Sequence, residues 1–276
     1  SHLSGDADLE PNPRLVEEAL RRRRATSLKD VPPDAAAATE ARDGASAELS
    51  AQVDPVEFRR DVRVLWEDHV AWTRLFIVSA VAGLGDTDAT AARLLQNQAD
   101  IGDAVAQFYG EDAGAQLEAL LRDHILIAGD LIAAAKGGDN AQVEDRSAAW
   151  YANADEIAEL LAAANPAWPV DTLKDMMRGH LDQTLAEATA QLTGDFEASV
   201  TEYAHITTHI LQMADTLADG IITQFPDRFT ESTVPDSEAA FNDAVRVLWT
   251  DHVAWTRPNR APNHQPARSS VANPAA

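Results

Sequence analysis

The sequence predicts an all-α protein, an up-and-down bundle of four to five long helices with short connector helices after the first. Two observations predict this class. Apolar residues recur at intervals of three and four along five long stretches, as on one face of a helix, and no segment keeps the alternation of a strand. Short turns rich in glycine, proline or asparagine separate the last four stretches, so neighbouring helices are expected to run antiparallel.

The first helix is expected over residues 55–82. Pro55 suits a first helical position, Asp54 precedes it as a cap, and Gly83 ends the stretch. A connector follows, with short helices expected near 88–96 and 101–108. The remaining long helices are expected over 112–135, 140–164, 170–192 and 196–224.

These helices define one expected domain, residues 54–228. The segment before it, residues 1–53, is rich in Asp, Pro and Ala and has little periodic hydrophobicity, so it is expected to be largely disordered. Residues 229–276 are expected to hold a linker, a helix over 241–257 and a disordered tail.

The chain is strongly acidic, with a formal net charge of −23, and −19 of this falls within residues 51–229. A field of this sign repels phosphate, so nucleic acid is not an expected partner. Only 3 lysines accompany 19 arginines and 28 aspartates. Such a balance resembles the proteins of extreme halophiles, especially haloarchaea, because molar salt screens dense surface carboxylates from one another. A merely acidic mesophilic protein is the alternative.

Three absences in the sequence narrow the class of protein further. The chain has no cysteine, which excludes a disulfide framework, a thiolate metal site and a cysteine nucleophile. No apolar run approaches the roughly 20 residues of a membrane-spanning helix. The basic run Arg21–Arg24 is not followed by the apolar segment of a secretory signal. A cytoplasmic protein without a membrane span is therefore expected.

One segment occurs twice. Val62–Arg74 reads VRVLWEDHVAWTR and Val245–Arg257 reads VRVLWTDHVAWTR, so 12 of 13 positions agree, and Phe58 pairs with Phe241 at the same offset of 183. Either a tandem duplication was cut short, or the second copy is a functional helix that docks on a bundle, of this chain or of another. Both interpretations make the 241–257 helix a candidate surface for homo-oligomer formation.

Five histidines lie within the expected long helices, each close to mid-height, so their side chains can meet in one layer of a bundle. They are His69, His124, His180, His205 and His209. His205 and His209 stand four residues apart, which puts both imidazoles on one helix face, and Glu202 shares that face.

This constellation indicates a transition-metal site in the bundle core. The expected ligands are His124, His205 and His209, then His69 and His180, with Glu202 as a carboxylate ligand or as the group that orients one. Imidazole with carboxylate suits Zn, Fe, Cu, Ni or Mn. The alternative is that each histidine is a hydrogen-bonded core residue without a ligand, because the His-x-x-x-His spacing is common in helices.

Several motifs resemble those of a family of uncharacterised helical-bundle proteins from bacilli and archaea. The motifs are Trp66–Arg74, Phe108-Tyr109-Gly110, Trp150–Asp155, and Met213-Ala214-Asp215 followed by Gly220–Phe225. The resemblance covers residues 58–226 and implies one helical domain, but no function.

Two functional classes are similar only in architecture. Hemerythrin-like bundles place histidines on four helices, as here, but they carry a Glu where this chain has Ala128 and Thr184. Thiol-transferase-type bundles use one early histidine with a late His-x-x-x-His, a count that His124 or His69 with His205 and His209 matches. The sequence thus predicts a halophilic helical bundle with a histidine-rich metal site, and no particular reaction. The alternative is a non-enzymatic structural or interaction module that self-associates through the repeated helix.

The charge pattern makes a prediction about salt. The free energy of unfolding should be larger in about 2 M KCl than in about 50 mM KCl, because the Debye length shrinks to about 3 Å or below and removes carboxylate repulsion. Denaturant titration at both salt concentrations measures this. Equal or greater stability at the lower salt would exclude adaptation to salt.

Overall fold

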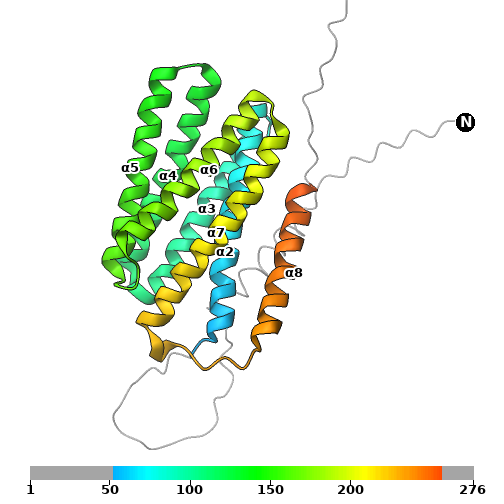
Figure 1. Ribbon diagram of the computed structural model, residues 1–276. Helices are drawn as coiled ribbons and strands as arrows, with labels where there is room; N and C mark the ends of the chain where they lie inside the picture. Colours follow the sequence, from blue (N-terminus) through cyan, green and yellow to red (C-terminus); the bar gives the residue numbers. More distant parts are fainter. Residues whose placement is uncertain (1–51, 257–276) are drawn as a thin grey trace, which may run out of the picture. The chain divides into compact units, whose positions relative to one another are not determined.

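The computed structural model describes residues 52–256 of the chain (Figure 1). Within them it is all-α, as predicted, and the extended backbone pairs only at an isolated bridge between Val53 and Phe229. The disorder expected for 1–53 and for the tail therefore lies almost entirely outside the described residues. The helices are α2 (Pro55–Ala82), α3 (Thr87–Tyr109), α4 (Glu111–Gly137), α5 (Asn140–Ala164), α6 (Val170–Thr193), α7 (Phe196–Gln224), the 3₁₀ turn η1 (Pro226–Arg228) and α8 (Asp236–Trp255).

Each helix from α2 to α7 packs against its neighbours in sequence, and α7 returns to α2, so the bundle closes on itself. Figure 1 shows consecutive helices running in opposite directions. The turns follow from their sequences. Gly138 and Gly194 adopt the left-handed conformation that ends α4 and α6. The next residues, Asp139 and Asp195, accept backbone N–H bonds from Gln142 and Ala198 and begin α5 and α7.

The prediction for the connector after the first helix was wrong. Instead of two short helices over 88–96 and 101–108, one continuous helix, α3, spans the segment. Gly102 lies inside it rather than between two helices. A Cβ on Gly102 would come within 2.9 Å of the Gly114 carbonyl on α4, and one on Gly114 within 2.5 Å of the Gly102 carbonyl. The glycine thus allows α3 and α4 to approach closely and does not end the helix.

The two ends of the bundle segment are tied together near the start of α2. Val53 N–H donates to the Arg228 carbonyl at 2.9 Å, and Thr230 N–H donates to the Val53 carbonyl at 3.0 Å. Phe229 is buried, with its ring centroid 5.1 Å from that of Phe58 and 5.9 Å from that of Phe108. The packed bundle therefore includes Val53 and Phe229, one residue beyond each expected boundary.

The second copy of the repeat is helical as predicted over residues 245–255, where it belongs to α8 beside α2; Arg257, the last residue of the expected helix, lies outside the described residues. None of the helices within residues 52–256 is long and apolar enough to cross a membrane.

The close α3–α4 approach predicts that Gly114→Ala destabilises the fold by about 1–3 kcal/mol, because its Cβ would overlap a backbone oxygen that cannot move independently. The matched control is Gly137→Ala near the end of α4, where an added Cβ meets nothing within 4 Å. Chemical denaturation of both variants measures the difference. Equal stability of the two variants would show that the helices separate at little cost.

Candidate functional site

Three of the five histidines that the sequence placed in the core meet in the middle of the bundle. His69 comes from α2, His124 from α4 and His180 from α6, and each is 2% exposed. The ring centroid of His180 lies 5.5 Å from that of His69 and 6.4 Å from that of His124. This histidine cluster is the layer that mid-height placement predicted, but it has three members and not five.

The other two histidines lie apart from the cluster. The buried stripe of α7 runs through Tyr203, Ile206 and Ile210, so His205 faces away from the core, with its side chain 59% exposed and Nδ1 3.5 Å from Glu202 Oε2. His209 lies at the edge of the stripe and donates from Nε2 to the Met176 carbonyl at 2.8 Å. Packing therefore exposes His205 and leaves His209 hydrogen-bonded to the α6 backbone, near enough to His180 to lower the pKa of that ring.

A hydrogen bond fixes the tautomer of His124. Its Nδ1 lies 2.9 Å from Asn153 Oδ1, and the Asn153 amide nitrogen donates to the Leu120 carbonyl at 3.1 Å. Because the amide orientation is thereby set, Nδ1 carries the proton, and Nε2 keeps its lone pair. This is the arrangement that orients a metal-ligating histidine.

His69 and His180 have different surroundings. His69 Nδ1 lies 3.3 Å from the side-chain nitrogen of Gln98, which also donates to the Leu94 carbonyl, and Asn97 is a second polar partner of the ring. His180 Nδ1 is buried with no hydrogen-bond partner among the described residues, and so is the indole nitrogen of Trp150. Buried polar atoms without partners are uncommon, so this pair marks a place where a ligand could bond.

Burial keeps all three imidazoles neutral. Loss of hydration lowers the pKa of His69 to about 3 and that of His124 to about 4. The pKa of His180 falls well below 6.5 for the same reason, and the proximity of His69, His124 and His209 lowers it further. At neutral pH each ring therefore retains one nitrogen lone pair, which is the form that binds metal ions.

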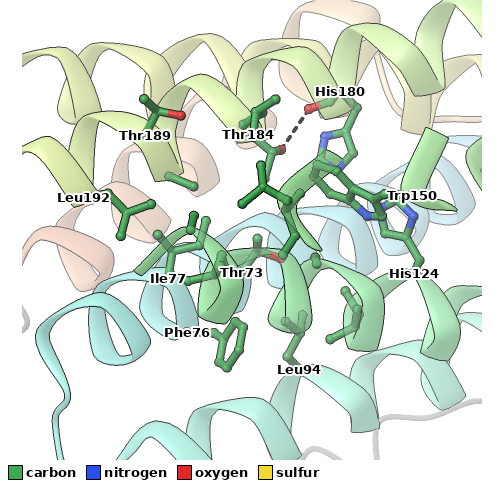
Figure 2. A pocket seen from close by; sticks show the side chains of 18 of the residues that line it. Thr73, Phe76, Ile77, Leu94, His124, Trp150, His180, Thr184, Thr189 and Leu192 are labelled. Carbon is green, nitrogen blue, oxygen red and sulfur yellow. Dashed lines mark hydrogen bonds between the residues drawn. The ribbon is translucent and has the colours of Figure 1, made fainter. Parts of the chain in front are cut away.

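The histidine cluster lies at one end of a cavity of about 120 Å³. Figure 2 shows His124, His180 and Trp150 gathered at this end, with Thr184, Thr189 and Leu192 further along. Most of the wall is aliphatic or aromatic. Its apolar residues include Phe76, Ile77, Leu94, Ile125, Leu131, Ile132, Leu185 and Leu192. The Thr73 and Thr184 hydroxyls donate to the carbonyls of His69 and His180, at 2.7 and 2.8 Å, so they are already hydrogen-bonded. A small, uncharged and largely apolar molecule fits such a space.

A buried ion pair lies close to the cavity. Arg74 of α2 donates to Glu187 of α6, and also to the Ser199 hydroxyl at 3.2 Å. The rings of Tyr203 and of Trp255 on α8 cover the guanidinium, at 5.0 and 4.8 Å from their centroids. Burial raises the pKa of Glu187 to about 7, although Arg74 opposes the shift. The pair joins α2 to α6 beneath α8.

Within residues 52–256, no three or more His, Cys, Asp or Glu side chains are already arranged to hold a metal ion. Sequence reasoning missed the polar partners of the cluster, Asn153 and Gln98. Their position in the sequence, on the buried face of a helix, could have identified them. Asn153 follows Trp150 by three residues on the buried face of α5, and Gln98 follows Leu94 by four on that of α3. A buried amide on a core stripe needs a polar partner.

No protein-family model matches the chain, and searches of curated proteins and of solved structures likewise return no match.

The neutral cluster predicts a loss of stability in acid. In the unfolded chain each histidine binds a proton below about pH 6.5, whereas the buried rings do not, so stability is present above this pH and is lost as pH falls. Between pH 7 and pH 5 each buried histidine should contribute about 2 kcal/mol to this loss. In apo protein with chelator, His124→Gln should therefore lose about 2 kcal/mol less than wild type over this range.

The exposed His205 provides the matched control. Its variant His205→Gln should follow the wild-type curve of unfolding free energy against pH, because its side chain is 59% exposed and lies outside the cluster. Parallel curves for wild type and His124→Gln would contradict a neutral His124.

Proposed function

We propose that the chain binds a first-row transition metal ion through His69, His124 and His180, and that the adjoining cavity accommodates a small apolar molecule next to that ion. The observation that carries the proposal is the convergence of three neutral, fully buried imidazoles from three helices, one of them with a buried nitrogen that has no partner. Binding requires the three rings to turn toward a shared centre.

The donor set suits Zn, Cu, Ni or Fe better than a hard cation, because imidazole nitrogen is a borderline ligand and no carboxylate lies in the cluster. Three protein ligands are the number that leaves a further coordination position available for water or substrate. A metal ion in such a setting supplies Lewis acidity, which lowers the pKa of a bound water or polarises a substrate oxygen.

Other residues of the chain would orient the ligands, donate a hydrogen bond to the bound molecule and exclude water from the site. Asn153 holds His124 in the tautomer that leaves Nε2 free, and the Gln98 and Asn97 amides restrain the His69 ring. The unpartnered indole N–H of Trp150 can donate to an oxygen atom at the same end of the cavity. The aliphatic wall excludes water and selects against charged ligands.

The test is metal content. Full-length chain purified without chelator in about 2 M KCl should carry or take up about one equivalent of Zn²⁺ or Co²⁺ per chain. His124→Ala and His180→Ala should each lower the affinity at least about tenfold, because each removes a ligand. Elemental analysis and Co²⁺ absorption measure these outcomes.

His205→Ala is the matched control and should retain full metal content, since His205 lies outside the cluster. Uptake below about a tenth of an equivalent, after reloading with each metal in turn, would exclude the metal site. If His205→Ala lost as much metal as His180→Ala, the assignment of the histidine cluster as the ligand set would be wrong.

One observation favours a second function, a non-enzymatic interaction module that self-associates through the repeated helix. The large apolar side chains of α8 are exposed in the single chain. The two functions occupy different parts of the molecule and are tested separately. We further infer from the acidic, lysine-poor composition that the protein works in the cytoplasm of a cell with molar internal salt.

A further inference from the structure

Helix α8 carries its apolar residues on the side that faces away from the bundle. Phe241 is 66% exposed, Leu248 68%, Trp249 64% and Val253 68%. With Val245 and His252 these residues form one side of the helix, here called the front face. Residues of this size are seldom exposed together on a single helix unless a partner covers them.

The same residues are buried in α2. The α2 counterparts of the front face are Phe58, Val62, Leu65, Trp66, His69 and Val70, of which all but Leu65 are buried. They contribute to the main core and to the histidine cluster. Two helices with nearly identical sequences therefore differ in which of their faces is buried. The face that α2 buries inside the bundle is the face that α8 presents to solvent.

The opposite side of α8 packs against α2 in register. The Thr250 hydroxyl donates to a Glu67 carboxylate oxygen at 3.4 Å. Arg60 Nε lies 3.9 Å from Asp243 Oδ1. In both pairs the two residues are 183 positions apart in the sequence. The offset equals that of the repeat, so corresponding positions of the two copies face each other. These are positions at which the copies differ. A glutamate in place of Thr250 would set two carboxylates against one another, and Asp243 supplies a partner for Arg60 and Arg63.

The bundle contains one groove for this front face, and α2 fills it. If α8 took that place, in its own chain or in another copy, an α2 would be released with the same apolar face exposed. Exchange therefore leaves one uncovered face per chain. In the described residues the other exposed large apolar side chains are spread over four helices: Leu126 on α4, Val170 on α6, Phe196 and Val200 on α7, and Trp255 at the end of α8. An extended apolar surface that could cover the front face of α8 is therefore the front face of α8 in a second copy of the chain.

We propose that two copies of this chain associate through the front faces of their α8 helices, in an isologous two-fold dimer. Phe241, Val245, Leu248 and His252 recur at four, three and four residues, which is the spacing of a two-helix seam. The six residues of the front face include no carboxylate and no arginine, although the exposed Glu238 lies on the same side one turn before Phe241. Asp243 faces α2, where it pairs with Arg63. The proposal deepens the interaction module named above and is independent of the metal site.

The net charge of −23 on each chain opposes association, and salt screens it. Dimer formation should therefore strengthen as KCl rises, which is opposite to the behaviour of an interface held by ion pairs.

Light scattering on the full-length chain tests the proposal. In about 2 M KCl, wild type at tens of micromolar should have twice the 29.7 kDa mass of one chain. Leu248→Glu/Trp249→Glu should have the mass of one chain, with unchanged helicity, because both side chains are exposed in the single chain. Phe196→Glu is the matched control: its side chain is 64% exposed on α7, and the variant should stay dimeric. A monomeric wild type, or a dimeric double variant, would overturn the proposal.

A single cysteine identifies the contact, because the chain has no other. Leu248→Cys lies at the centre of the front face, so two paired α8 helices bring the thiols together in parallel or antiparallel orientation, and mild oxidation should give a covalent dimer. Phe196→Cys should not cross-link. A dimer that Leu248→Cys does not cross-link would show exchange of α8 into the groove of the other chain and would overturn face-to-face pairing. Metal content measured on the same samples separates this result from the metal proposal.

Discussion

Helix α2 buries polar groups on both of its sides, and much of the remaining structure satisfies them. His69 faces the bundle interior, where the amides of α3 and the imidazole of His180 meet it. Arg74 pairs with Glu187 on α6 and is covered by Tyr203 and Trp255. On the outer side Glu67 is 5% exposed because α8 lies over it. A charged or polar group inside a protein costs several kcal/mol unless it is partnered, so these contacts restrict how α3, α6, α7 and α8 can pack.

The histidine cluster lowers the stability of the fold, and the proposed metal ion would offset part of that loss. Three imidazoles that cannot take up protons lower the stability of the folded state in acid, and a buried nitrogen without a partner adds to the cost. Leucines at these positions would stabilise the bundle more. An apolar cavity beside the rings is a further loss of packing. Such a combination is typical of a site that exchanges stability for ligand binding, and metal coordination would offset part of that loss.

Much of the fold could be predicted from local signals. Asp54, Pro55 and Gly83 mark the ends of α2, and the glycine–aspartate pairs at 138–139 and 194–195 mark both sides of two turns. The prediction failed at α3, because Gly102 has the same local signature whether it ends a helix or lets another helix approach it. Only the neighbouring backbone of Gly114 distinguishes these cases. For the site, depth along the helix grouped all five histidines, but the structure brings together only His69, His124 and His180 and exposes His205, because depth does not tell which side of a helix faces inward.

The sequence by itself determined the helical class, most of the helix ends, the acidic lysine-poor composition, the absence of cysteine chemistry and the existence of a second copy of the α2 segment. These are properties of short windows or of composition, where periodicity and capping act over a few residues. Tertiary structure decided which side of each helix faces inward. The rotation of α7 placed His205 in solvent, and the closing of the bundle by α2 left α8 with its core-type face outside. Nearly identical residues are core in one helix and surface in the other, because burial depends on which groove is vacant and not on the residues alone.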